Sequence, residues 1–383
     1  PILVYERVGL EDQFVGKFYL DEWKNTSERE FEFSAIDLVG LLEMINYDGG
    51  FWATPTEIGA VLEQLLTPIN VAYSLSPALS GVKVSGWIPP GNYRGAIQQV
   101  CFAAGATVST ARSQVLEIKP ITIPQLVYDT RVTDQDKLME RSVKLEQQIT
   151  SIEIVSHNYS QSETVETIFD EDLQAGSHKI IFEKPYYSIL VNGPGYVANT
   201  LATEAGDELI TEGGDSLEVG GQYNFGTNSL YLELSSPGHV TITGRSWVDS
   251  KRSFLFREEG IADDSNPIKV EDATMVSVGN AQGVLDKMRD YYRQRYTQEM
   301  TMLPTNVKPG NIVKTSAFYG ESLIASVLKM ELDLTGGYLA KTSIRGWRPQ
   351  YVPPSEQPVR RARVGVAICG ADLTRQNMFR EYE

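Results

Sequence analysis

Short alternating runs of apolar and polar residues constrain the fold of this chain more than any other feature. Between about residues 107 and 275, runs such as Leu116-Glu117-Ile118 and Val240-Thr241-Ile242-Thr243 recur between glycine-rich turn clusters such as Glu212-Gly213-Gly214-Asp215. Successive side chains of a β-strand point to opposite faces, so a period of two predicts half-buried strands. The middle of the chain is therefore expected to be mostly β.

Aromatic and β-branched residues extend this prediction towards both ends of the chain. Six aromatic side chains lie between Phe14 and Phe33 without helical periodicity, which is typical of strands. Four apolar residues near the other end alternate with charged ones, namely Leu328, Met330, Leu332 and Leu334. The turn Thr335-Gly336-Gly337 follows them, so residues 338–344 are predicted to return as the second strand of a hairpin. For the polar run 133–148, the sequence is compatible with either a short helix or a solvated connection.

Four helices are predicted from capping residues followed by apolar residues at helical spacing. Ser34 precedes the first, and Thr54-Pro55-Thr56-Glu57 places a cap, a proline and an acid at the start of the second. Asn92 caps the third, which ends at Gly105, and Asn280 caps a longer fourth. Such caps bond free N–H groups of a first helical turn, and glycine readily adopts the left-handed conformation that closes a helix. The expected fold class is α+β, mainly β.

Length, charge and cysteine usage narrow the class of protein. A chain of 383 residues exceeds what one hydrophobic core usually supports, so two to four domains are expected. The net charge of −16 argues against a bound nucleic acid, because phosphate recognition needs dense lysine and arginine. No membrane segment and no secretory signal are expected, and the start at Pro1 without Met suggests the inside of a longer reading frame. Cys101 and Cys369 are expected to be buried thiols in a reducing compartment.

Residue types that carry catalysis or bind metals are sparse. His157, His178 and His239 are the three histidines, and none has a second ligand at metal spacing. The sequence holds no nucleophile elbow, zinc-protease helix or phosphate-binding loop. The string from Gly193 to Ala198 fits a dinucleotide fingerprint, but no helix follows it, so a turn is favoured. The sequence thus predicts no catalytic, cofactor-binding or metal-ligating residue, and no enzyme.

Three other groups of residues admit both a functional and a structural interpretation. The acidic clusters Asp170-Glu171-Asp172, Glu258-Glu259 and Asp263-Asp264 could bind calcium or form a glycosidase pair, although their spacing favours solvated loops. The basic residues Arg360, Arg361 and Arg363 could dock on an acidic partner or belong to a solvated arm. The five tryptophans could line a sugar groove but are more often core or interface residues. They are Trp23, Trp52, Trp87, Trp247 and Trp347.

Several segments together resemble the hub proteins of phage tails, although none is specific alone. The pattern is an alanine-x-aspartate-x-x-glycine-leucine-leucine helix, a glycine-tryptophan-isoleucine-proline turn, an arginine-led helix and a following strand. In this chain the corresponding segments are Ala35 to Leu42, Gly86 to Pro89, Arg94 to Ala104, the strand after Ala111-Arg112-Ser113, and the stretches 153–159 and 329–337. The resemblance covers residues 14–345. It is to baseplate and tail-tip hubs, late control protein D-like and tail-associated proteins, of Gram-positive phages, prophages and phage-tail-like particles.

The resemblance implies a subunit with two tube-like β-barrel domains and two insertions. The first barrel is expected to comprise residues 1–33 and 106–150, with its opening strands incomplete, and the second residues 151–160 and 245–346. A small helical domain is expected at 34–105 and an inserted β domain at 161–244. Residues 347–383, with four prolines between Arg348 and Pro358, are expected to form a linker and a C-terminal arm. The resemblance carries over no active residue.

The resemblance also implies a homotrimer at the distal end of a virion tail, assembled in the cytoplasm of the bacterial host. Expected partners are the tail tube or distal tail protein, the spike or tip protein, and further the tape-measure protein and a baseplate wedge. DNA is expected only as passing cargo in a channel whose negative wall repels it. Two alternatives stay open: the carrier domain of a tail-associated cell-wall hydrolase, and a tail-tip protein that binds host carbohydrate. Contractile and flexible tails are equally compatible with the sequence.

Overall fold

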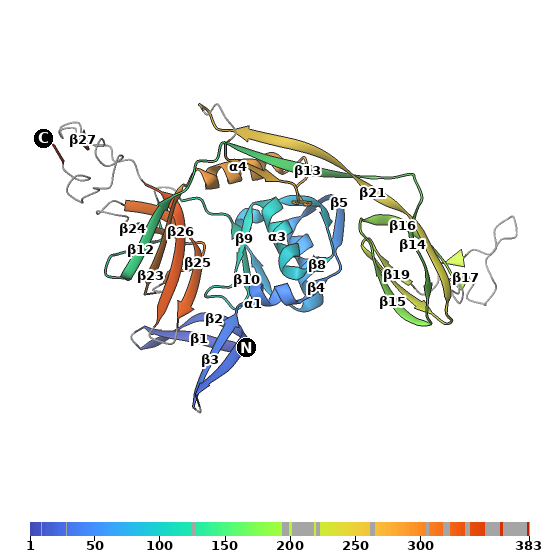
Figure 1. Cartoon of the computed structure of the whole chain (residues 1–383), viewed down its shortest axis with the longest axis horizontal. Coiled ribbons are helices and arrows are strands. Elements are labelled where there is room, and N and C mark those ends of the chain that lie inside the picture. The colour runs from blue at the N-terminus through green and yellow to red at the C-terminus, as the bar shows by residue number, and fades with distance from the viewer. Residues whose placement is uncertain are drawn as a thin grey trace.

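The fold is α+β and mainly β, as the alternating sequence predicts. The computed structural model describes residues 1–8, 10–27, 29–124, 127–193, 199–200, 218–219, 223–260, 265–303, 306–316, 322–333, 338–348, 361–362 and 381–382. Figure 1 shows an elongated molecule, with a central helical unit between a six-stranded sheet and a distal β unit. In the described part, no helix has the length and apolar character needed to cross a bilayer.

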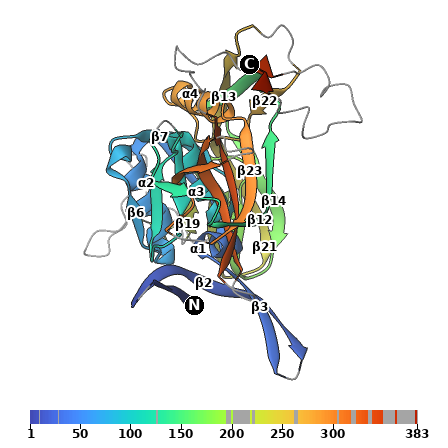
Figure 2. The same ribbon diagram turned by 90° about the vertical axis from the view of Figure 1, so that its left-hand side faces the viewer.

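A three-stranded antiparallel sheet opens the chain and confirms the strands predicted there. Its strands are β1 (Ile2–Val8), β2 (Glu11–Ser27) and β3 (Glu30–Ile36), in that order. The base of the sheet lies against the body of the molecule, where Val15 is buried. The far part of β2 and β3 projects as a hairpin below the rest of the molecule in Figures 1 and 2. The sheet therefore has an anchored end and a projecting end.

The central unit holds three helices and several short strands around one core. Its elements are α1 (Leu38–Leu41), β4 (Asn46–Tyr47), β5 (Gly50–Glu57), α2 (Ile58–Leu66), β6 (Tyr73–Leu75), β7 (Lys83–Ile88), β8 (Gly91–Asn92), α3 (Tyr93–Ala104), β9 (Ala106–Ser109) and β10 (Leu116–Pro120). Along α2, the residues Ile58, Val61, Leu62 and Leu65 are buried at helical spacing. A fourth helix, α4 (Ala281–Tyr292), packs into the same core through Val284 and Leu285.

Two of the four predicted helix starts are confirmed and two are wrong. The Asn92 carboxamide accepts a hydrogen bond from the Gly95 N–H at 2.8 Å, and Gly105 closes α3 with φ +62°. The fourth helix also begins directly after Asn280, as predicted. The first helix, however, is capped by Asp37, because Ser34 belongs to β3, and the predicted cap Thr54-Pro55-Thr56-Glu57 lies in β5. Pairing with β7 extends to Glu57, so tertiary contact overrides the local signal.

The six-stranded sheet has its own smaller core. Its order is β11 (Thr130–Val132), β24 (Ile312–Ser316), β25 (Ser322–Asp333), β26 (Leu339–Trp347), β23 (Tyr296–Met302) and β12 (Lys137–Leu145). The antiparallel pairing of β25 with β26 confirms the predicted hairpin, whose turn at residues 335–337 lies outside the described residues. The run 133–148 contains the strand β12, so neither the helix nor the solvated connection predicted for it is correct.

A long ribbon connects the central unit to the distal β unit. It consists of β13 (Ser151–Gln161) and β21 (Gly238–Arg257), with β22 (Pro267–Val270) beside β13. The first half of β21 pairs with β14 (Glu166–Leu173) and β16 (Tyr186–Asn192), and the second half pairs with β13. A second sheet of β15 (Gly176–Ile181), β20 (Ser229–Leu234) and β19 (Tyr223–Gly226) completes the distal unit. The two sheets share a core that includes Phe182, Leu232 and Ile242.

Strand pairing differs from the partition expected from the sequence. Strands β11 and β12 fall within 106–150, expected in the first barrel, yet they pair with β24 and β23. Met275 and α4, expected in the second barrel, are buried in the central core with Ile154 of β13. An alternating sequence fixes which side chains are buried but not which strand lies beside it. Of the expected C-terminal arm, the structure describes two short strands, β27 (Arg361–Ala362) and β28 (Glu381–Tyr382).

Candidate functional site: an aromatic hairpin and a polar junction

The projecting hairpin of β2 and β3 has one aromatic face. Trp23 lies opposite Phe33 across the two strands, and the Trp23 and Phe31 rings lie 6.1 Å apart between centroids. Their exposed fractions are 65%, 57% and 61% for Trp23, Phe33 and Phe31. None of the three belongs to a buried cluster formed by the described residues. An apolar patch of this kind usually marks an interaction site.

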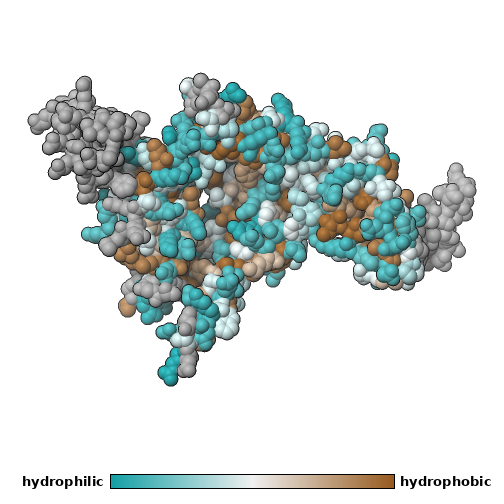
Figure 3. All heavy atoms as spheres, viewed as in Figure 1, coloured by the Kyte–Doolittle hydropathy of each residue, from teal (hydrophilic) through white to brown (hydrophobic). Residues whose placement is uncertain are grey.

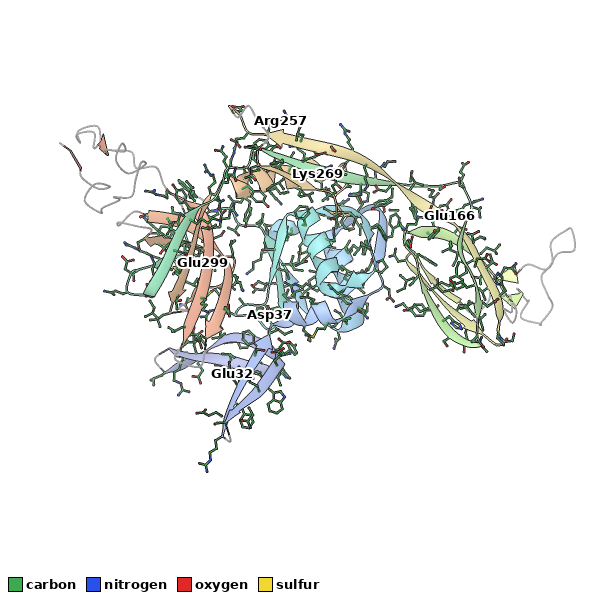
Figure 4. All side chains as sticks on the ribbon, in the orientation of Figure 1. Glu32, Asp37, Glu166, Arg257, Lys269 and Glu299 are labelled. Atoms are coloured by element: carbon green, nitrogen blue, oxygen red, sulfur yellow. The ribbon has the colours of Figure 1, made fainter. Side chains whose placement is uncertain are left out.

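The opposite face of the hairpin is charged. Lys24 and Glu32 lie side by side in the register and form an ion pair at 2.8 Å, and Glu22 lies beside them on β2. Figure 4 labels Glu32 on the hairpin, and the side of the hairpin seen in Figure 3 is mainly hydrophilic. The hairpin is thus amphipathic although no core of its own lies behind it, and a two-stranded hairpin alone is marginally stable in water.

The base of the same sheet is held firmly. The Glu6 carboxylate and the Arg112 guanidinium form an ion pair at 2.6 Å, and both side chains are largely buried. The Arg112 N–H also donates to the Val15 carbonyl at 3.0 Å. Burial and the neighbouring Glu6 carboxylate raise the pKa of Tyr338 to about 12, so its hydroxyl stays neutral. The hairpin therefore projects from a fixed anchor.

A polar junction joins the central unit to the distal β unit. The Asp48 carboxylate contacts the Lys179 ammonium and accepts a hydrogen bond from the Tyr231 hydroxyl at 2.7 Å. Burial opposes ionisation of Asp48, but the bonds from Lys179 and Tyr231 outweigh it and lower the pKa of Asp48. Nearby, the Trp87 indole N–H donates to the Asn228 carboxamide oxygen at 2.6 Å. Side chains far apart in the sequence thus hold the two units together.

The glycine-tryptophan segment that supports the resemblance lies in strand β7, not in a turn as expected, and has a packing role. Gly86 has φ +144°, and an added Cβ would lie 2.2 Å from the Thr274 carbonyl oxygen. This close approach lets the Trp87 N–H reach the same carbonyl at 3.4 Å. Asp37 of the preceding motif is equally structural, because it caps α1 and accepts a hydrogen bond from the Thr110 hydroxyl at 2.6 Å. These motif residues make capping and packing contacts within the fold.

The histidines lie at three separate places. Both ring nitrogens of His157 face acceptors on the ribbon, the Asp249 carboxylate at 2.7 Å and the Glu271 carbonyl at 2.9 Å. His178 bonds the backbone carbonyl of Gln174. The exposed His239 lies between two carboxylates of the first acidic cluster, which is described next. Among the residues that the structure covers, no group of three His, Cys, Asp or Glu side chains could hold a metal ion.

The three predicted acidic clusters have different surroundings. Asp170 and Asp172 lie on β14, and each places a carboxylate oxygen 3.0 Å from a ring nitrogen of His239. These two hydrogen bonds raise the pKa of His239. Glu258 pairs with the Arg293 guanidinium at 2.9 Å, while the cluster of residues 263–264 lies outside the described residues. The two described clusters are therefore not brought together.

The tryptophans also have separate environments, so they do not form a sugar groove. Trp23 is on the hairpin and Trp87 at the junction, while Trp52 donates to Gln64 at 2.8 Å and Trp347 to the Pro124 carbonyl at 2.9 Å. The fifth, Trp247, packs on Phe51 with ring centroids 4.7 Å apart.

Of the remaining candidates from the sequence, one cysteine is described by the structure, and the others lie mostly at positions that it does not describe. Cys101 is buried as predicted, and desolvation raises the pKa of its thiol to about 12. Cys369 and the basic residues 360 and 363 lie outside the described residues, as do the side chain of Arg361 and most of the 193–198 string.

Comparison with known proteins gives only distant similarity. No protein-family model and no curated protein matches the chain. A tail protein from Neisseria meningitidis MC58 is 10% identical with a TM-score of 0.44, covering 87% of this chain and 79% of its own. Prophage tail protein gp18 from Listeria monocytogenes EGD-e is 8% identical with a TM-score of 0.44, and the match covers 89% of this chain and 81% of that protein. The 43 kDa tail protein of prophage MuSo2 from Shewanella oneidensis is 10% identical with a TM-score of 0.40, and the match covers 88% of this chain and 79% of that protein.

Proposed function

We propose that this chain is a structural, non-enzymatic component of a phage-type tail, a hub that connects the tail tube to the spike or tip. The observation that carries this proposal is the presence of two open sheets in one subunit, the three-stranded sheet and the six-stranded sheet. The three-stranded sheet ends in β3, and the six-stranded sheet ends in β12 and β11, each paired on one side within the described residues.

Open sheets of this type favour ring assembly. A strand at the edge of a sheet presents unpaired backbone groups that readily pair with another chain. If one edge of each copy pairs with a different edge of the next copy around a rotation axis, the contact repeats until the ring closes. Closed sheets then surround a central channel, as expected for a homotrimer with two barrel-like domains per subunit. The strong negative charge of the chain suits such a channel, because like charge repels passing DNA.

The roles of the resemblance motifs also support a hub. Trp87 joins the central unit to the distal β unit through Asn228, while Asp37 and Gly86 hold segments of the central unit together. A hub must transmit force between tube and tip, so fixed junctions between its units suit that task. The tail tube or distal tail protein and the spike or tip protein remain the proposed neighbours, with the tape-measure protein and a baseplate wedge as further ones.

The decisive experiment is the native mass of the purified chain, followed by imaging of any oligomer in negative stain. A three-fold ring with a central channel is the expected result. Rings of another symmetry, or a compact dimer without a channel, would contradict the hub. A peptidoglycan zymogram and a glycan-binding assay, both expected to be negative, address the hydrolase carrier and the carbohydrate-binding tip.

A further inference from the structure

We infer that the β2–β3 hairpin of one copy adds to the free edge of β12 in a second copy of this chain. This inference deepens the proposed hub by naming the surface through which subunits join. The inference rests on the proposed function only for the number of copies in the ring.

The hairpin supplies an edge and an apolar face that need a cover. Strand β3 pairs with β2 alone, so its second edge is unpaired in the described part of the chain. Phe31 and Phe33 lie on one face of that edge strand, and Glu32 lies on the other. Both phenylalanines are more than half exposed, as is Trp23 beside them. Adding a hairpin to another sheet provides backbone partners and covers alternate side chains at the same time.

Strand β12 offers a matching edge. Within the part of the chain that the structure describes it pairs with β23 alone, and the register from Arg141 to Leu145 is regular. Val143 lies opposite the fully buried Gln298, so Val143 and Leu145 share the core face of the sheet. Leu145 nevertheless keeps 52% of its surface exposed. The core of the six-stranded sheet is thus open at this edge, where Phe31 and Phe33 of an incoming hairpin would cover it.

Charge favours the same pairing. The hairpin stretch from Leu20 to Ile36 carries five carboxylates and two cations, whereas Leu138 to Leu145 carries two cations and one carboxylate. Lys137, at the start of β12, is buried against Asp134 and Ser316 and does not contribute. Lys144 lies on the outer face of β12, where it is well exposed and pairs with Glu146 at 3.1 Å. With the apolar faces aligned, Glu32 of the hairpin falls on the same outer face as Lys144. Opposite charges directly across a strand pair are favourable.

Three other edges of the described sheets suit the hairpin less well. Strand β11 has three residues, which allows few ladder bonds. Strand β22 begins with Pro267, which cannot donate a hydrogen bond. Strand β14 carries Asp170, Glu171 and Asp172, which repel an acidic hairpin. Strand β12, with nine residues, combines length, apolar alternation and positive charge.

A complementation experiment tests this pairing. Trp23→Ser and Phe33→Ser together remove the hairpin surface, and Leu145→Asp blocks the β12 edge; all three side chains are exposed, so the folded subunit should be retained, which circular dichroism checks. Each variant should sediment as a monomer, with self-association weakened about thirtyfold or more for the loss of a central aromatic contact. The matched control Leu190→Ser alters a residue of the distal unit that is 68% exposed and should shift association by less than about twofold.

An equimolar mixture of the hairpin variant and the edge variant should restore pairs but not rings. In that mixture the intact hairpin belongs to the edge variant and the intact β12 edge to the hairpin variant, so one contact can form and cannot propagate. A photo-cross-linking residue at Phe31, in a mixture of heavy-isotope and ordinary protein, should give inter-copy links to peptides of 137–145. Association of the hairpin variant as tight as wild type would overturn the inference, as would wild-type protein that stays monomeric at about 100 µM. Hairpin-to-β12 links in rings that are not three-fold would instead count against the hub alone.

Discussion

Replacing Gly86 with alanine should destabilise the central unit more than the same change at glycines that lack its two constraints. The backbone of Gly86 has φ +144°, which residues with a Cβ rarely adopt, and the added Cβ would lie 2.2 Å from the Thr274 carbonyl oxygen. The backbone strain costs about 1–3 kcal/mol. Overpacking against rigid backbone costs about 1–3 kcal/mol or more. The free energy of unfolding should therefore fall by about 2–6 kcal/mol, out of the roughly 5–15 kcal/mol of a typical domain.

Three other glycines separate the two contributions. Gly81 has φ +77° and open space around an added Cβ, so Gly81→Ala should cost about 1–2 kcal/mol from the backbone alone. Gly346 has no left-handed backbone, but its Cβ would lie 2.0 Å from the Ile324 carbonyl oxygen, so Gly346→Ala tests overpacking alone. Gly91 has neither constraint, and Gly91→Ala should stabilise the chain by less than about 1 kcal/mol.

Urea unfolding followed by tryptophan fluorescence measures this series, because Trp52 and Trp87 both lie in the central unit. Stability should fall in the order Gly91→Ala, Gly81→Ala, Gly86→Ala. Equal losses for Gly86→Ala and Gly81→Ala would show that the approach to Thr274 carries no energy. The packing role of the glycine-tryptophan segment would then be refuted.

Three ionisable side chains give further tests. The bonds from Lys179 and Tyr231 lower the pKa of Asp48, so the stabilisation that Asp48 provides should be full above about pH 4 and vanish as the pH falls through the lowered pKa. The melting temperatures of wild type and Asp48→Asn should therefore converge in acid, and a difference that stays constant with pH would exclude this linkage. The raised pKa of His239 has the opposite sign, so the advantage of wild type over His239→Gln should be present below about pH 6.5 and be lost as the pH rises through the raised value. Cys101, with its pKa raised to about 12 by burial, should resist iodoacetamide at about pH 8 in the native chain and react in urea; rapid native labelling, located by peptide mass mapping, would show that the core opens there.

Local signals in the sequence predicted local structure. Asn92 and Gly105 were assigned correctly because cap and stop depend on neighbouring backbone alone. The proline at position 55 matched the pattern of a helix start, but this segment is a strand because β5 pairs with β7. Alternation likewise identified β25 and β26, whereas β12 was missed because charged residues and a bulge near Leu138 interrupt its pattern.

The candidate surfaces were less accessible to sequence reasoning. The aromatic residues of the hairpin were placed in strands, yet alternation cannot tell whether a face is covered by the same chain. Asp48 and Tyr231, which meet at the junction, are 183 residues apart, and no local pattern marks either. Long-range polar contacts of this kind emerge only once the strands are placed.

The distal β unit enters and leaves the molecule through neighbouring positions of one ribbon. Gln161, the last residue of β13, lies opposite Trp247 of β21. Paired strand residues stand about 5 Å apart, a gap that a two-residue turn spans. Joining the chain there would remove the whole unit and keep the register that holds the central core. An unrelated module could be spliced into the same position, so this outer part of the molecule is free to diversify while the assembly scaffold stays constant.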